Sequence, residues 1–161
     1  MAADVLTRVG EVIDAILAIS RALATELVGE DPEQRFDVHD GPSLTVLYER
    51  ALIIGMTDGP DNPGYRSVID RAQGMGRRKT ETVTVHCLLT LSTGDDDAIA
   101  RLRSQASSLM RRLDEQLRTD EVTERPWQRV AVLGDADWVP LLHDEGSTVN
   151  VLFDIEAACL L

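Results

Sequence analysis

The sequence has few cysteines and no long apolar run, and these shortages exclude whole classes of protein. Cys87 and Cys159 are its two cysteines, too few for the disulfide framework of a small secreted domain. No apolar run reaches the length of about 18 residues that a membrane-spanning helix needs. Glu11 and Asp14 interrupt the N-terminal stretch, so we expect no signal peptide. We predict a chain with no membrane association that is made in a reducing cytoplasm.

Positive charge is also scarce. The 28 aspartates and glutamates outnumber the 16 lysines and arginines, which leaves a formal net charge of −12. Gripping nucleic acid requires clustered Lys and Arg to neutralise phosphates, so we do not expect a nucleic-acid-binding protein. An acidic surface is compatible with lining a passage through which DNA slides without sticking. The simpler alternative is that the charge only keeps the protein soluble.

Catalytic and metal-binding motifs are missing as well. The sequence contains no G-x-S-x-G nucleophile elbow, and its glycines match neither a phosphate loop nor a dinucleotide fingerprint. The three histidines lack the spacing of metal ligands. His86 and Cys87 are neighbours in a predicted strand, so their side chains face opposite sides and cannot form a catalytic pair. We therefore predict no catalytic residue, no cofactor and no metal.

One acidic cluster, Asp95-Asp96-Asp97, allows two interpretations. Carboxylate oxygens are the ligands that hard cations prefer, which is compatible with a metal site. The cluster lies, however, between a predicted strand and a predicted helix. Aspartates at that place cap the exposed N–H groups of the helix and complement its dipole. We predict helix capping.

The most regular stretch of the chain runs from residue 80 to residue 117. Apolar and polar residues alternate from 82 to 91, which is typical of a half-buried strand. The apolar side includes Cys87, which we expect to behave as a small hydrophobic residue there. After residue 98 the apolar residues recur in steps of three and four, which places them on one helical stripe: Ile99, Leu102, Ala106, Leu109, Met110, Leu113 and Leu117. The sequence predicts a long strand that turns directly into a long helix.

Three weaker elements precede this unit. The apolar stripe of residues 3–27 predicts a long helix that Gly29 and Pro32 end. Residues 30–40 are acidic and aperiodic, so we expect a connecting loop with Phe36 as an anchor. Residues 43–55 are rich in strand-forming residues, but their alternation is irregular. This pattern fits either a strand that is buried on both faces or a strand with a bulge near Glu49 and Arg50.

The C-terminal third predicts a group of strands. We expect short strands at 128–133 and 138–143 with a turn at 134–137 between them. After a turn at 144–146, clean alternation through Cys159 predicts the final strand. The order of elements predicts one α+β domain over residues 1–161, with a mostly antiparallel sheet packed against two long helices and a long mobile loop.

That loop covers residues 57–80, a segment rich in glycine and proline. It can include a short strand at 65–69. It is the one locally basic segment of the acidic chain, and its cations are Arg66, Arg71, Arg77, Arg78 and Lys79. We hypothesise that these residues contact a partner subunit, a tube or DNA. The alternative is a solvated loop whose charges only maintain solubility.

The two tryptophans stand out because aromatic residues make up only 4% of the chain. Trp127 follows Pro126, a setting in which tryptophan commonly closes the end of a core. Half-exposed tryptophans are also favoured anchors in contacts between subunits. For Trp127 and Trp138 we expect core closure, with subunit contact as the alternative.

The order of elements resembles that of the tail terminator proteins of long-tailed bacteriophages. The resemblance covers nearly the whole chain and is carried by VTVHCLLTLSTGDDDAIARLRSQASSLMRRL and GSTVNVLFDIEAA. It implies a structural, non-enzymatic virion protein, assembled in the host cytoplasm. It further implies a homo-oligomeric, hexameric ring that caps the tail tube, stops its polymerisation and meets the head connector in the neck. DNA would pass through the lumen without sequence-specific binding.

Three other functions stay open at this point. A head-completion or stopper protein of the neck would also suit the pattern, with the basic loop reaching into the channel. A small cytoplasmic enzyme with an unrecognised site belongs to a different class, and a cellular adaptor domain is the third alternative.

Overall fold

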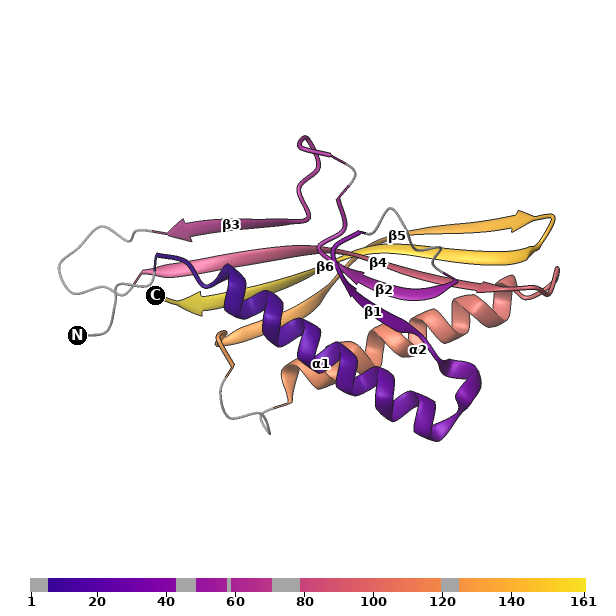
Figure 1. Cartoon of the computed structure of the whole chain (residues 1–161). Coiled ribbons are helices and arrows are strands. Elements are labelled where there is room, and N and C mark those ends of the chain that lie inside the picture. Colours follow the sequence, from indigo (N-terminus) through magenta and orange to yellow (C-terminus); the bar gives the residue numbers. More distant parts are fainter. Residues whose placement is uncertain (1–5, 43–48, 58, 71–78, 120–124) are drawn as a thin grey trace.

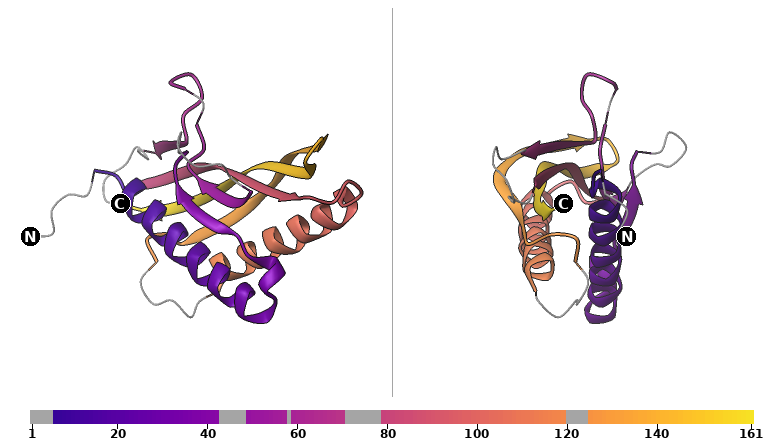
Figure 2. Two further views of the ribbon diagram at one scale, coloured as in Figure 1. Left: turned by 45° about the vertical axis from the view of Figure 1, so that its right-hand side comes forward. Right: turned by 90° about the vertical axis from the view of Figure 1, so that its left-hand side faces the viewer.

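The computed structural model describes residues 6–42, 49–57, 59–70, 79–119 and 125–161. A six-stranded sheet carries both long helices on one of its faces (Figure 1). Seen along the sheet, α1 and α2 lie side by side beneath it (Figure 2). This α+β architecture confirms the fold class that the sequence predicts.

The strands follow one another across the sheet in the order β1-β2-β4-β6-β5, and β3 pairs with β4 as well. Every pair is antiparallel except β1–β2. The elements are α1 (Val9–Glu30), the 3₁₀ turn η1 (Pro32–Gln34), β1 (Asp37–Asp40), β2 (Arg50–Ile54), β3 (Tyr65–Asp70), β4 (Thr80–Thr93), α2 (Ile99–Arg118), β5 (Arg129–His143) and β6 (Gly146–Leu160). β2 and β3 share one edge of β4, because β2 pairs with its C-terminal half and β3 with its N-terminal half.

Strand β4 and helix α2 form the centre of the core, as predicted. The apolar side of β4 is buried against the helices, with Val83, Val85, Cys87, Leu89 and Leu91 no more than 1% exposed. The stripe of α2 meets this face through Leu102, Ala106, Leu109, Leu113 and Leu117. Burying each such leucine or valine contributes about 1.5–3 kcal/mol, so this layer supplies much of the stability.

Helix α1 begins later and ends later than the sequence pattern indicates. It covers Val9–Glu30, and Leu6, at 77% exposure, precedes it. The helix starts where the backbone of Arg8 is engaged by the carboxylate of Glu81. Gly29 lies inside the helix, which ends as Asp31 adopts an extended conformation before Pro32. The buried stripe itself is as predicted, from Val12 to Leu27.

The segment between α1 and β2 is not the simple loop that we predicted. Residues Asp37–Asp40 form β1, which pairs in parallel with β2. A strand of four mostly polar residues has no alternation to reveal it. The predicted anchor Phe36 is confirmed, since its side chain is buried in the core.

Strand β2 falls within the predicted range of 43–55. It covers Arg50–Ile54, and residues 43–48 lie outside the described part of the chain. The residues from Ala51 to Ile54 are all buried. This confirms a strand buried on both faces, one of the two interpretations that the irregular alternation allowed.

Strand β5 is one long element, so the two short strands predicted at 128–133 and 138–143 are wrong. The turn predicted at 134–137 is replaced by a bulge between Val132 and Ala136. Strand β6 runs unbroken opposite both halves and pairs with each of them. A bulge absorbs the extra residues without ending the strand, which is why the turn-like sequence Gly-Asp-Ala-Asp does not reverse the chain.

A projecting segment separates β2 from β3 and stands away from the sheet (Figure 1). Its described residues are 55–57 and 59–64. Its two ends meet at one residue of β4: His86 O accepts the backbone N–H groups of Gly55 and Met56, and His86 N–H donates to Gly64 O. A Cβ on Gly64 would lie 2.5 Å from Gly55 O, so the close approach of the two ends of the segment requires glycine at position 64. The strand after it is β3, which confirms the short strand expected near 65–69.

Candidate assembly surface

The outer half of the β5–β6 hairpin exposes apolar side chains on both of its faces. We call residues 138–145 the arm. Trp138 and Leu142 point to the side of the helices, since they pair with Val151 and Ser147, yet they are 38% and 69% exposed. Val139 and Leu141 point the other way and are 39% and 45% exposed. The arm therefore lies beyond the area of the sheet that the helices cover.

Strand β5 is also an open edge. It is 15 residues long, and within the described chain it pairs only with β6. An unpaired edge presents a row of N–H and C=O groups on which another chain can add a strand. Soluble proteins usually protect such edges with charge or cover. The arm combines this open edge with exposed apolar side chains, which is typical of a contact between chains.

The tip of the arm packs against the turn between β4 and α2, where Ser147 pairs with Thr93. Gly146 has a φ of +133°, and a Cβ there would lie 2.0 Å from Thr93 O. The hydroxyl of the buried Ser147 donates to Asp95 O at 2.8 Å. At the same end of the hairpin, His143 Nε2 lies 2.9 Å from Thr148 Oγ1. These contacts hold the tip of the arm in a fixed position beside the end of β4.

The aspartate cluster at this end does not cap α2, contrary to our prediction. The N-cap is Ala98, and no side chain caps the helix there. Asp95 instead pairs its carboxylate with Arg101 at 2.7 Å. The helix begins too late for the aspartates to reach its first N–H groups. Their charge adds to that of Asp144 and Glu145 at the tip of the arm, so this end of the molecule is acidic.

The opposite end of β5 and β6 holds a cavity of about 760 Å³ with three arginines in its wall. We call it the arginine pocket. It is lined by Leu117, Arg118, Arg125, Trp127, Gln128, Arg129, Val130, Ala131, Glu156 and Ala158. Three guanidinium groups and the carboxylate of Glu156 line the described wall. Arg118 is paired with Asp114 at 3.1 Å, so Arg125 and Arg129 carry the positive charge of the wall that has no carboxylate partner in the described residues, in a chain whose net charge is −12.

Two features build this pocket. Arg125 donates to Leu117 O and Gln116 O, which are carbonyls at the C-terminal end of α2, where the helix dipole favours a cation. The guanidinium carbon of Arg125 also lies 5.9 Å from the ring centroid of Trp127, a cation–π distance. Trp127 is buried and closes this end of the core, as predicted. Trp138 does not, since it lies on the exposed arm.

Of the five basic residues that the sequence singled out, the structure describes Arg66 and Lys79. Arg66 lies exposed in β3, and Lys79 lies exposed just before β4. Arg71, Arg77 and Arg78 fall outside the described residues. Lys79 O accepts the backbone N–H of Leu161, which brings the start of β4 to the end of the chain.

Sequence reasoning missed the arginine pocket. Arg118 and Arg125 border a run of acidic residues in the sequence, so the region reads as charge-balanced. The one available signal was Arg-Pro-Trp-Gln-Arg at 125–129, which sets two cations on either side of a tryptophan.

A polar pair on the face opposite the helices was also unforeseen. His86 Nδ1 and Asp154 Oδ1 lie 2.5 Å apart and border a hollow of about 320 Å³. No serine or threonine belongs to the described lining of this hollow. Cys87 is fully buried, and burial raises the pKa of its thiol. The arrangement therefore places no thiolate beside the His86–Asp154 pair.

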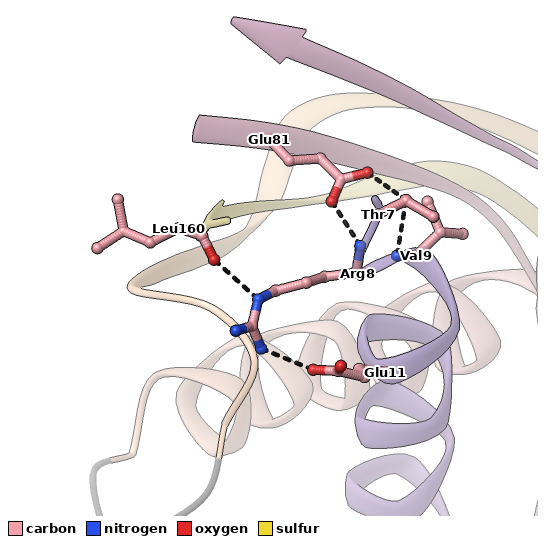
Figure 3. Close-up of polar contacts among 6 residues, drawn as sticks. All are labelled: Thr7, Arg8, Val9, Glu11, Glu81 and Leu160. Atoms are coloured by element: carbon pink, nitrogen blue, oxygen red, sulfur yellow. Dashed lines mark hydrogen bonds and ion pairs between the residues drawn. The ribbon is translucent and has the colours of Figure 1, made fainter. Parts of the chain in front are cut away.

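The most buried charge of the described chain is Glu81 in β4, and Figure 3 shows its contacts with the residues at the start of α1. Its carboxylate accepts hydrogen bonds from Thr7 Oγ1 at 2.5 Å and Arg8 N at 2.6 Å. Ser67 Oγ of β3 donates to it at 2.5 Å. Arg8 also donates through Nε to Leu160 O at 2.8 Å and pairs with Glu11 at 2.7 Å. The cluster ties the start of α1 to β3, β4 and β6.

This environment acts on Glu81 in two opposite ways. Burial raises the pKa of the carboxyl, whereas the hydroxyls of Ser67 and Thr7 and the N–H and charge of Arg8 lower it. The donors prevail, and the pKa of Glu81 lies below its ordinary value. Glu81 is therefore ionised at neutral pH, and its role is to hold the start of α1 on the sheet.

Two further findings describe the chain as a whole. Among the described helices, none is long and apolar enough to cross a membrane. No group of three or more His, Cys, Asp or Glu side chains in the described ranges is placed to hold a metal ion. In comparisons with known proteins, no family model matches this chain, and no curated protein does either.

Proposed function

We propose that the chain is a structural, non-enzymatic subunit of a homo-oligomeric ring. In this proposal the ring belongs to the neck of a long-tailed phage virion, where it caps the tail tube, stops its polymerisation and meets the head connector. The arm is the observation that carries the proposal. A hairpin that is held in place at its tip, with an open edge and apolar side chains exposed on both faces, favours a contact with a protein partner.

The fold supports the same proposal. The α+β layout matches the order of elements on which the resemblance to tail terminators rests. The arm is exposed at one end of the sheet, and the surface that is exposed at the other end consists of different side chains. A subunit that joins its neighbours through two different surfaces builds rings when the rotation closes.

The net charge of −12 fits the passage of DNA through such a ring. A lumen with negative potential repels phosphates, so DNA crosses without sequence-specific binding. The exposed cations Arg66 and Lys79 are the observation that favours a second candidate, a stopper or head-completion protein whose basic segment reaches into the channel.

Electron microscopy of the purified protein, alone and with purified tail tubes, tests the proposal. We expect rings, hexameric in the first candidate function, that sit on tube ends and prevent further growth of the tubes. Rings that bind the head connector and ignore tube ends would favour the stopper. A protein that stays monomeric both with and without tubes contradicts both functions.

A further inference from the structure

We infer that the acidic arm of one copy inserts into the arginine pocket of the next copy. The inference rests on the proposed function, since it names the contact through which the copies assemble. The occupant of the pocket is thus a second copy of this chain. Its inserted part is the arm, residues 138–145.

The arm cannot reach the pocket of its own chain. Leu142 in the arm pairs with Ser147 at one end of β6, and Arg129 in the pocket pairs with Ala158 near the other end. The eleven residue steps between Ser147 and Ala158 span about 36 Å at ~3.3 Å per step. Both sites belong to one rigid pair of strands, so any contact between them joins two copies.

The charges of the two sites are complementary. Asp144 and Glu145 are exposed at the tip of the arm and have no cation partner within the described residues. Arg129 is exposed in the pocket and likewise has no carboxylate partner in the described part. Uncompensated charges of opposite sign steer two such surfaces together and fix their register.

The apolar parts are complementary as well. Leu117, Trp127 and Val130 supply apolar wall to the pocket. The arm offers the exposed side chains of Leu141 and Leu142. Burying both leucines removes the two most exposed large apolar side chains of the hairpin from water. An apolar contact rimmed by charge pairs is the usual anatomy of a specific interface.

The contact is heterologous, because arm and pocket are different surfaces of the same chain. Each copy would use its arm on one neighbour and its pocket on the other. Repetition of a single heterologous contact closes into a ring when the rotation allows it and otherwise continues as a filament. The same contact therefore explains why a ring forms and why no ring forms when the arm or the arginine pocket is lost.

Another occupant is possible on sequence grounds. Residues 120–124, which lie outside the described part, adjoin Arg125 in the chain and carry Asp120, Glu121 and Glu124. If these carboxylates filled the pocket instead, removing the charges of the arm would leave assembly unchanged. The experiment below separates the two occupants.

The test uses two variants that each lack one half of the contact. The arm variant is Leu142→Ser/Asp144→Ser/Glu145→Ser, and the pocket variant is Arg118→Ser/Arg129→Ser. All five side chains are exposed, so circular dichroism and thermal denaturation should match those of the wild type. Size-exclusion chromatography with light scattering reports the mass of each species.

We expect the wild type to form the closed assembly and each variant alone to be monomeric, with self-association weakened at least tenfold. In an equimolar mixture, the intact arm of the pocket variant binds the intact pocket of the arm variant. In that dimer the unoccupied arm and the unoccupied pocket are the mutated ones. The mixture should therefore give a 1:1 dimer and nothing larger.

A control variant, Asp96→Ser/Asp97→Ser, removes two carboxylates from the same acidic end but outside the arm. It should assemble as the wild type does. If the arm variant assembles normally, or if the mixture stays monomeric, the contact is overturned while the ring itself stands. A wild type that is monomeric under all conditions overturns the contact and the proposed function together.

Discussion

The carboxylate of Glu81 accepts a hydrogen bond from the backbone N–H of Arg8 at 2.6 Å, although 73 residues separate the two in the chain. With Thr7 and Ser67 donating to the same carboxylate, a buried charge is fully compensated by donors. The start of α1 is thereby fixed on the sheet.

Replacing Glu81 with glutamine should lower the free energy of unfolding by about 2–3 kcal/mol at pH 7. The amide has one acceptor oxygen and an NH₂ group that faces donors, so buried donors lose their partner. Urea unfolding monitored by circular dichroism measures the difference. Glu156→Gln, an exposed change on β6, is the matched control and should stay within about 0.5 kcal/mol.

The contribution of Glu81 should also depend on pH. Its pKa is lower in the folded protein than in the unfolded chain. The stabilisation is therefore fully present above the ordinary pKa of glutamate and is lost as the pH falls through the lowered value. The difference between wild type and Glu81→Gln should be constant from pH 7 to about pH 5 and shrink in more acidic buffer. A difference that grows on acidification would contradict this assignment.

Gly146→Ala should destabilise the fold by several kcal/mol, about 3 or more. The new Cβ would lie 2.0 Å from Thr93 O and 2.8 Å from Gly94, and the φ of +133° strains any L residue. Thermal denaturation measures the loss. Gly134→Ala is the control, because nothing lies within 4 Å of a Cβ at Gly134. Equal melting temperatures for the two variants would refute the close approach.

The two thiols should resist alkylation while the protein is folded. Cys87 and Cys159 are buried, and burial, aided by the charge of Glu81, raises the pKa of Cys159 to about 11. At pH 8 only about one Cys159 thiol in a thousand would be ionised. Mass spectrometry after iodoacetamide treatment should find both cysteines modified in urea and neither in buffer. Rapid labelling of the folded protein would show that this part of the core opens.

Trp138 should report assembly by fluorescence. It is 38% exposed on the arm, whereas Trp127 is 8% exposed in the core. In a Trp127→Phe variant, emission should shift to shorter wavelength and acrylamide quenching should fall as the protein concentration rises. The complementary Trp138→Phe variant keeps only Trp127, which is already buried beside the pocket, and should show a smaller change in both measurements. A constant Trp138 spectrum in an assembled sample would exclude the arm from the interface.

Clean periodicity explains which elements could be predicted from the sequence. Strands β4 and β6 alternate over most of their length, and α2 keeps one apolar stripe, because each buries mainly one face. β1 was not predicted, because its four residues show no apolar–polar alternation and form a strand by pairing with the neighbouring β2. β5 was divided wrongly because its turn-like residues are held in line by β6, which the local sequence does not reveal.

The candidate surface was harder to predict, since it depends on distances across the fold. The arginine pocket brings the last turn of α2 to the first residues of β5. The pair His86–Asp154 joins residues 68 positions apart. In both cases the side chains are ordinary in sequence and become a site only through strand register. Of the residues proposed from the sequence, Arg66 and Lys79 are exposed but do not line the pocket.

The close approach of Gly55 and Gly64 isolates the projecting segment from the sheet, so that changes in the segment need not affect the strands. Because both ends are fixed at His86, residues between them can change in length and chemistry without altering the register of β2 or β3. This makes the segment a natural graft position for an epitope, a fluorophore or a gold-binding peptide. A label placed there would mark each subunit in an assembly at a site remote from both the arm and the arginine pocket in sequence.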